Sequence, residues 1–283
     1  MRKRNVNKIK FIQIIEFWNS ILFRMVNLFR FFQYIFSYRK INKIIKKNNI
    51  LKGVHKGDRC FIVFGGMSLL DVDLSVIENE IVCVTNHFYN TTAYDIVKPN
   101  YYFACDTLFF SSGGNHVKEI VEKTKDSAKC IFSQKVIPLD IQDDHVYVTC
   151  SLHKPTKNHI HSDLTSISSN FGSVSMFAIN CAIYMGFKEV YLLGYDFPAG
   201  NMPHFYKEAS IEKSWRDKRL VQNDKYEVCE RHWQYAQAQF ENYYLAEHAI
   251  KNGVKIYNCN PASNVRSFEF KKIDEVLNEI QSV

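Results

Sequence analysis

From Gly57 onward, short apolar segments alternate with longer segments that have helical periodicity. This alternation predicts βαβ units and therefore an α/β fold with a mostly parallel sheet. We interpret residues 57–283 as a single Rossmann-like domain. The predicted strands are 60–64, 81–85, 101–104, 129–132, 146–149, 189–193 and 255–258. The predicted helices are 69–78, 117–125, 173–185, 230–251 and 273–281.

The basic residues are concentrated at the N-terminus. Residues 1–56 contain 14 Lys and Arg and a single acid, Glu16, so this segment carries a charge of +13. Residues 57–283 contain 22 basic and 28 acidic residues and carry a charge of −6. A basic segment joined to a mildly acidic domain calls for a local explanation.

Apolar residues recur at a helical spacing from Phe11 to Phe36, over about seven turns, with polar residues largely on the opposite face. Arg24 and Arg30 interrupt this segment, so it lacks the uncharged run of about 18 residues that spans a bilayer. Lys and Arg side chains follow between residues 39 and 47. We expect residues 1–48 to bind an anionic membrane surface as an amphipathic helix, with residues 1–56 forming a unit of their own.

Two other roles for this helix stay open. It could pack on its own domain or on a second subunit, which would make the protein a homo-oligomer. Nucleic-acid binding is not expected, because basic residues without a known reader fold are weak evidence for it. The segment has no small-residue cleavage site of a signal peptide. We therefore expect a cytoplasmic protein that is peripheral on the inner face of the cytoplasmic membrane.

The sequence indicates neither a metal nor a cofactor. Its eight cysteines form no CxxC pair, which is typical of buried thiols in a reducing compartment. Asp71 and Asp73 form a D-x-D inside the predicted helix 69–78, where we expect solvated carboxylates and no manganese site. His159 and His161 lack a third ligand nearby.

Ligands of parallel sheets bind beyond the carboxyl ends of the strands. Small or polar residues follow several predicted strands, where they could contact a phosphate or a ribose, although a plain turn is the alternative at each place. A segment without a firm element, 198–228, is expected to be a lid. The candidate binding residues are Gly65, Gly66, Ser68, Asn86, Asp106, Gly172 and Ser173.

Four segments resemble glycosyltransferase family 42, the bacterial lipooligosaccharide sialyltransferases. The resemblance covers about residues 58–265, and segment 186–197 is its most specific part. The segments are IVFGGMSL (62–69), CVTNHFY (83–89), GFKEVYLLGYDF (186–197) and KIYNCNPAS (255–263).

The resemblance implies a GT-A-like sialyltransferase variant that inverts the anomeric carbon without a metal. It implies a CMP-sialic acid donor and a glycan or glycolipid acceptor. Gly66, Ser68 and Asn86 match contacts to the cytidine and phosphate, and Gly172 and Ser173 match the Gly/Ser pair that opens a long helix. Two further residues, one in the expected lid and one in a predicted helix, match catalytic groups of the family. These are Tyr206, which holds the leaving phosphate, and His232, the general base that begins the predicted helix 230–251.

The sequence departs from the family at two places. The family's Gly-Asn-Gly turn is Phe64-Gly65-Gly66 here, and Pro198 stands where a second phosphate-binding tyrosine is expected, a role that His204 could take. The third-strand Asn falls near Cys105 or Asp106. The donor could therefore be another CMP-activated keto-sugar such as Kdo. A pyrophosphokinase-like or motility-accessory Rossmann protein and a scaffold with an inactive site are further alternatives, although the chain lacks a P-loop lysine.

Overall fold

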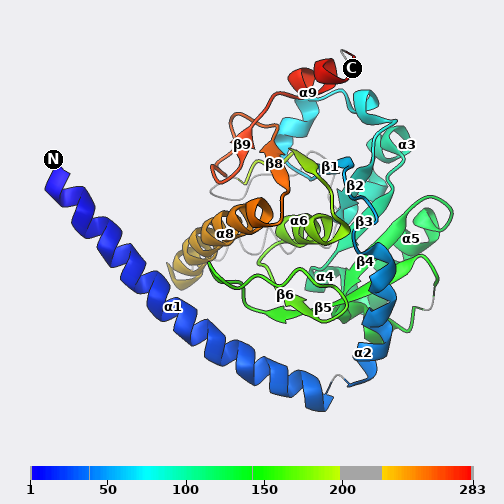
Figure 1. Ribbon diagram of the computed structural model, residues 1–283. Helices are drawn as coiled ribbons and strands as arrows, with labels where there is room; N and C mark the ends of the chain where they lie inside the picture. Colours follow the sequence, from blue (N-terminus) through cyan, green and yellow to red (C-terminus); the bar gives the residue numbers. More distant parts are fainter. Residues whose placement is uncertain (1, 38, 142, 198–224, 282–283) are drawn as a thin grey trace.

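The computed structural model describes residues 2–37, 39–141, 143–197 and 225–281. Its centre is a nine-stranded sheet with the order β6-β5-β4-β3-β2-β1-β7-β8-β9, in which every pair of neighbours is parallel (Figure 1). The predicted α/β fold with a mostly parallel sheet is confirmed. The strands are β1 (Arg59–Val63), β2 (Val82–Thr85), β3 (Tyr101–Ala104), β4 (Lys129–Ser133), β5 (Val146–His153), β6 (Ile167–Ser169), β7 (Glu189–Leu193), β8 (Lys255–Asn258) and β9 (Glu269–Phe270).

Helices cover both faces of this sheet, as its almost fully buried strands require. One apolar core lies between the sheet and the helices α6 and α8, and a second core lies on the other face under α3, α5 and α9. The helices are α1 (Arg2–Ser37), α2 (Arg39–Ile45), α3 (Ala93–Val97), α4 (Thr107–Phe110), α5 (Asn115–Thr124), α6 (Val174–Met185), α8 (Lys225–Lys251) and α9 (Ile273–Gln281). The 3₁₀ turns are η1 (Lys46–Leu51), η2 (Met67–Asp71), η3 (Leu74–Ile77), η4 (Asn86–Asn90), η5 (Ser112–Gly114) and η6 (Gln134–Leu139).

The helix predicted over 69–78 is wrong. The chain forms two short 3₁₀ turns there, η2 and η3, with Val72 in an extended conformation between them. The carboxylate of Asp73 accepts hydrogen bonds from the backbone N and the Oγ of Ser75, at 3.0 and 2.7 Å. Such a local bond competes with helical hydrogen bonding and starts a new turn. Asp73 therefore has a capping role in η3.

Helix α1 lies along the outside of the molecule and contacts its own domain through its polar face (Figure 1). The side-chain amide of Asn27 exchanges two hydrogen bonds with the backbone of Lys154, at 3.0 and 2.7 Å. Arg30 donates to the carbonyl of Leu152 at 2.5 Å, and Arg24 bonds the ring of His159 at 2.8 Å. Of the sequence alternatives, packing on its own domain is therefore present in the structure.

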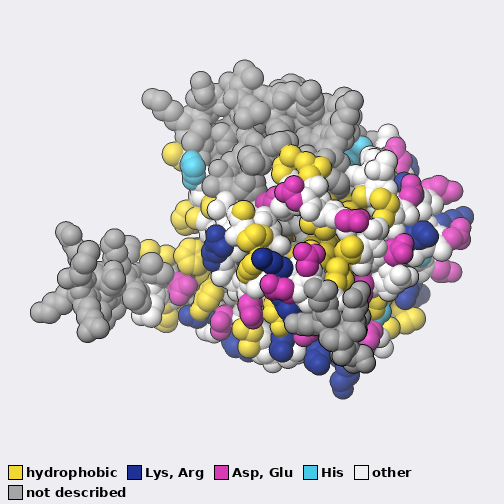
Figure 2. Space-filling model, turned by 90° about the horizontal axis from the view of Figure 1, so that it is seen from above, with side chains coloured by type: hydrophobic (Ala, Val, Ile, Leu, Met, Phe, Trp, Pro, Cys, Tyr) yellow, Lys and Arg dark blue, Asp and Glu magenta, His cyan; other side chains and the backbone are white. Residues whose placement is uncertain are grey.

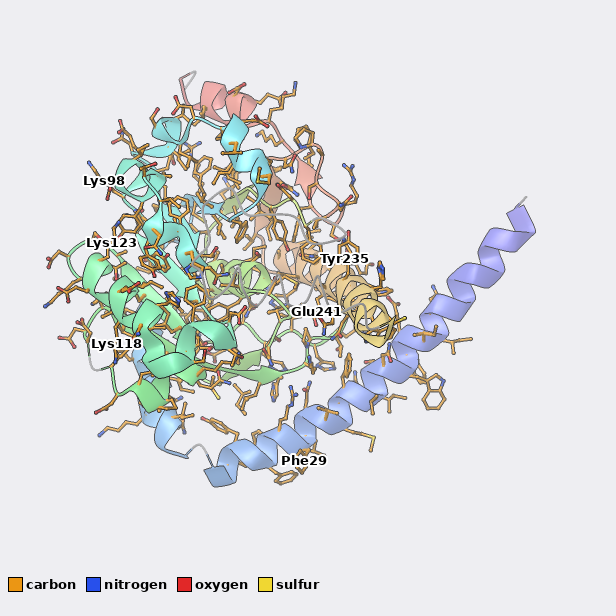
Figure 3. All side chains as sticks on the ribbon, turned by 180° about the vertical axis from the view of Figure 1, so that it is seen from behind. Phe29, Lys98, Lys118, Lys123, Tyr235 and Glu241 are labelled. Carbon is orange, nitrogen blue, oxygen red and sulfur yellow. The ribbon has the colours of Figure 1, made fainter. Side chains whose placement is uncertain are left out.

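The apolar face of α1 points away from the domain. The side chains of Trp18, Met25 and Phe29 are 62%, 65% and 70% exposed. Figure 3 shows Phe29 directed outward, and Figure 2 shows hydrophobic side chains on the part of α1 that projects from the body. An apolar stripe that faces outward is the reverse of an ordinary surface helix, whose apolar face packs on the core.

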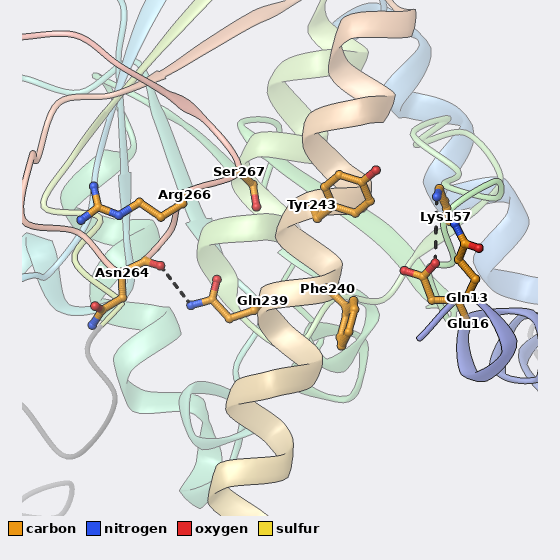
Figure 4. A pocket seen from close by; sticks show the side chains of 9 residues that line it. All are labelled: Gln13, Glu16, Lys157, Gln239, Phe240, Tyr243, Asn264, Arg266 and Ser267. Atoms are coloured by element: carbon orange, nitrogen blue, oxygen red, sulfur yellow. Dashed lines mark hydrogen bonds and ion pairs between the residues drawn. The ribbon is translucent and has the colours of Figure 1, made fainter. Parts of the chain in front are cut away.

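The N-terminal half of α1 meets the domain less tightly. Here the carboxylate of Glu16 lies 3.9 Å from Nζ of Lys157 (Figure 4). A cavity of about 450 Å³ opens between α1, α8 and residues 264–267, with Phe240 and Tyr243 on its α8 side. No helix within the described ranges has both the length and the apolar character needed to cross a bilayer.

Candidate functional site

The sheet changes direction between β1 and β7. From β1 to β6 successive strands are added on one side, and from β7 to β9 they are added on the other. The connections that leave β1 and β7 therefore diverge, and in an open α/β sheet the crevice beyond the carboxyl ends of such strands is the usual ligand site. Residues 64–68 and 194–197 leave the sheet at this point.

Small residues are required where these two connections meet. The backbone N of Gly66 donates to the carbonyl of Gly194 at 3.0 Å. A Cβ atom on Gly66 would lie 2.4 Å from that carbonyl oxygen and 2.5 Å from Cγ of Asp196. Gly194 has a φ of +65°, a conformation that favours glycine. The glycines thus have a steric reason to be here that is independent of any ligand.

Asp196 joins the ends of three strands. Its carboxylate accepts hydrogen bonds from the backbone N of Ser68 at 2.9 Å and from the Ser68 hydroxyl. It also accepts one from the side-chain amide of Asn260, which follows β8, at 2.8 Å. The hydroxyl proton of Ser68 is therefore already used within the protein. Ser68 shapes the turn and can offer a ligand only its lone pairs.

Asn86 follows β2 with a φ of +52°. The Tyr102 hydroxyl donates to the Asn86 carbonyl at 2.5 Å and holds this uncommon backbone conformation. The side-chain oxygen of Asn86 is buried and has no hydrogen-bond partner among the described residues. A buried acceptor of this kind usually has a partner, so a ligand group that donates a hydrogen bond would fit here.

The first turn of α6 lies over the neighbouring strands β2 and β3. Ser173 caps the helix by accepting from the backbone N of Met176 at 3.3 Å, and the rings of Phe177 and Phe103 lie 6.1 Å apart. The backbone N of Gly172 donates to Oε2 of Glu241 at 2.8 Å. Glu241 is only 3% exposed, and burial raises the pKa of its carboxyl group although the Gly172 N–H lowers it.

The third strand ends beside a lysine that sequence reasoning did not single out. Nζ of Lys135 donates to the carbonyl of Cys105 and to Oγ1 of Thr107, both at 2.9 Å. Asp106 lies between these two residues and is exposed. Lys135 thus brings a positive charge to the carboxyl end of β3.

His232 does not begin its helix as the sequence predicted. Helix α8 starts at Lys225, so His232 lies two turns inside it and is exposed. One turn further on, Tyr235 packs against Phe197, with ring centroids 5.3 Å apart (Figure 3). His232 therefore lies one turn of α8 before the contact with the chain that leaves β7. His204 and Tyr206 fall outside the described residues.

Sequence reasoning missed Asp196, Asn260 and Glu241 as parts of this site. Asp196 and Asn260 belong to the segments that resemble the sialyltransferase family, but nothing local shows that their side chains meet. Within the described residues no group of three His, Cys, Asp or Glu side chains is arranged to hold a metal ion.

Comparisons with known proteins gave matches among solved structures alone. No family model matches the sequence, and no curated protein matches it significantly. Among solved structures, the chain is similar to the Campylobacter jejuni sialyltransferase CstII, determined with cytidine-5'-monophosphate. The identity is 16% and the TM-score 0.47, over 76% of this chain and 85% of that one. It is also similar to the monofunctional alpha-2,3-sialyltransferase Cst-I from C. jejuni, with 16% identity and a TM-score of 0.45 over 76% and 80% of the two chains. We therefore base the proposed function on the residues of this chain.

Proposed function

We propose that this protein is an inverting, metal-independent glycosyltransferase. It would move sialic acid, or a related nonulosonate, from a CMP-sugar to a cell-surface glycan or glycolipid. The observation that carries the proposal is the side-chain oxygen of Asn86, buried and without a partner among the described residues, at the strand end next to the point where the connections of β1 and β7 diverge. The resemblance of the four sequence segments to family 42 supplies the donor class.

The residues around the crevice suit a cytidine monophosphate. The free oxygen of Asn86 can accept from a ribose hydroxyl or from the cytosine amino group. Gly65 and Gly66 allow the nucleotide to approach the backbone, and Ser68 keeps their turn in place. Gly172 and Ser173 open α6 over β2 and β3, and we assign them to the nucleotide by the resemblance, although the Gly172 N–H is already used by Glu241.

The reaction requires a base and a group that stabilises the leaving phosphate. The acceptor hydroxyl oxygen attacks the anomeric carbon while the bond from that carbon to the phosphate oxygen breaks. CMP departs with the bonding electrons, and His232 takes the proton of the hydroxyl. We assign stabilisation of the departing phosphate to Tyr206 and His204.

CMP should raise the melting temperature of the protein. A ligand at 100 times its Kd stabilises the native state by about 2.7 kcal/mol, or roughly 5 °C for a domain of this size. Differential scanning fluorimetry with CMP, UMP and GDP, each with and without EDTA, measures this. We expect CMP to give the largest shift and EDTA to leave it unchanged.

Gly66→Ala should remove the CMP-dependent shift, because the added Cβ displaces Gly194 and Asp196. Gly253→Ala is the control for destabilisation alone, since its φ of +73° strains an alanine but no neighbour lies within 4 Å of the added atom. Absence of any CMP shift in the native protein contradicts the proposal. A shift that depends on a nucleoside triphosphate and Mg²⁺ favours the pyrophosphokinase-like alternative.

We also propose that the outward face of α1 binds the inner surface of the cytoplasmic membrane and brings the crevice to lipid-borne acceptors. Exposed Trp, Met and Phe side chains followed by basic residues are typical of an interfacial helix. Deleting residues 1–48 is a poor test, because Ile41, Ile45 and Asn48 are buried and Asn48 donates to the carbonyls of Val148 and Leu164.

Replacing Trp18, Met25 and Phe29 together by serine should reduce sedimentation with anionic phosphatidylglycerol vesicles by at least about tenfold. Each large apolar side chain contributes about 1.5–3 kcal/mol when it leaves water. The polar contacts of α1 remain in this variant. Leu70→Ser with Ile250→Ser, which alters exposed apolar residues of the domain, is the control. Unchanged vesicle binding by the triple variant contradicts the proposal, and dissociation of an oligomer in the same variant assigns the face to a second subunit.

A further inference from the structure

A second cavity, of about 200 Å³, lies beyond the carboxyl ends of β3 to β6. Cys105, next to Asp106, lines it on one side, and Phe177, in the first turn of α6, lines it on another. Its β3 side lies one strand away from Asn86, which follows β2. The sequence did not indicate this cavity, because its walls come from eight separate elements and connections.

The cavity is positively charged. Arg30 reaches it from α1 and Lys135 from η6, and no Asp or Glu lines it. Both cations donate to neutral partners, Arg30 to the Leu152 carbonyl and Lys135 to the Cys105 carbonyl and the Thr107 hydroxyl. Among the described residues neither forms an ion pair with a carboxylate. An anionic ligand group placed here would pair with both cations.

A buried hydroxyl points to the same ligand chemistry. Ser133, the last residue of β4, lines the cavity and is only 3% exposed. Its Oγ has no hydrogen-bond partner among the described residues. A buried hydroxyl without a partner is costly, and a carboxylate oxygen would satisfy it.

We propose that this cavity binds the carboxylate of the acidic sugar, and that Arg30 makes the N-terminal helix part of the substrate site. The inference rests on the proposed function for the identity of the sugar. The acid group of a CMP-linked keto-sugar lies beside the phosphate, so it belongs in a cavity next to the nucleotide crevice. Guanidinium and carboxylate groups form paired, charge-assisted hydrogen bonds, which Lys135 and Ser133 can supplement.

The contacts of α1 connect helix position to this cavity. Asn27, one turn before Arg30, holds the helix to Lys154 through two hydrogen bonds. If α1 left the domain, Arg30 would leave the cavity with it. Binding of the sugar should therefore depend on a docked helix, independently of any membrane.

Isothermal titration calorimetry tests this inference. Free N-acetylneuraminate, the probe, is titrated into the full-length protein saturated with CMP. Arg30→Ala should weaken binding of the probe by about 10- to 100-fold, the usual value of a hydrogen bond to a charged group. Arg30→Lys should bind the probe more tightly than Arg30→Ala but less tightly than the native protein. Ser133→Ala should lose less affinity for the probe than Arg30→Ala. Arg24→Ala is the control, because Arg24 lies on the same helix and bonds His159 outside the cavity.

Three results would overturn the inference. Arg30→Ala could bind the probe like the native protein. Asn27→Ala, which loosens α1 from Lys154, could leave binding of the probe unchanged, which would contradict the dependence of the cavity on a docked helix. Inorganic phosphate could bind in an Arg30-dependent way and displace the probe, which would assign the cavity to a phosphate. Failure of CMP to bind, with Arg30-dependent probe binding intact, would count only against the proposed nucleotide.

Discussion

His232→Ala is expected to lower the rate of sugar transfer by about 10²–10⁴-fold, the usual contribution of a general base, while the Kd for CMP stays within about twofold of the native value. His232 is exposed on α8, one turn from the contact between Tyr235 and Phe197, so its loss removes a proton acceptor without removing a packing contact of the core. Transfer is measured with CMP-N-acetylneuraminate and a lactoside acceptor, and CMP binding by calorimetry.

Cys229→Ala is the matched control for this prediction. Cys229 is exposed on the same helix, one turn before His232, and its replacement should leave the transfer rate unchanged. Full transfer by His232→Ala contradicts the assignment of the base. Loss of CMP binding together with transfer shows that the variant disturbs the nucleotide crevice, and the assignment then fails as well.

Asp196→Ala is expected to destabilise the protein by about 2–4 kcal/mol and to lower its melting temperature by roughly 4–7 °C. The half-buried carboxylate accepts from Ser68 twice and from Asn260 once, so its removal leaves three donors at the crevice unpaired. The connections after β1, β7 and β8 lose their common partner. CMP affinity should therefore fall by at least about tenfold as well. Thermal unfolding and calorimetry measure the two effects.

Asp73→Ala is the control for Asp196→Ala. Asp73 also accepts two hydrogen bonds, both from Ser75, but it is exposed and caps only η3. We expect a cost of about 1 kcal/mol, with transfer retained. In the double variant Asp196→Ala/Ser68→Ala, the second substitution should add little, because the two side chains act through one contact. Equal losses from Asp73→Ala and Asp196→Ala would contradict the special role of Asp196.

The elements with strong local patterns were predicted from the sequence. The strands at 101–104, 189–193 and 255–258 match β3, β7 and β8; β3 and β7 contain runs of four apolar residues, and β8 has the apolar pair Ile256 and Tyr257. The short strands β6 and β9 were not predicted. β6 consists of Ile167, Ser168 and Ser169, and β9 of only two exposed residues, so neither has an apolar run to detect. Their pairing is decided by the neighbouring strands.

The candidate site could be predicted only in part. Strand ends with glycine, serine and asparagine are visible in the sequence, and parallel topology gathers strand ends at one edge of the sheet. The sequence does not show which hydrogen-bond partners the side chains of those residues have. The hydroxyl of Ser68 is used by Asp196, 128 residues away, whereas the side-chain oxygen of Asn86 has no partner among the described residues. Arg30 and Ser133 lie 103 residues apart and line one cavity, which no local pattern indicates.

The sequence by itself determined the α/β layout and the amphipathic N-terminal helix, because hydrophobic periodicity records which side of each element avoids water. It did not determine which way that helix faces. Tertiary structure decided that Asn27 and Arg30 contact the domain while Trp18 and Phe29 face outward, since backbone carbonyls at Leu152 and Lys154 are available as partners. Contacts between distant residues depend on how the layers pack, and periodicity within one segment carries no information about them.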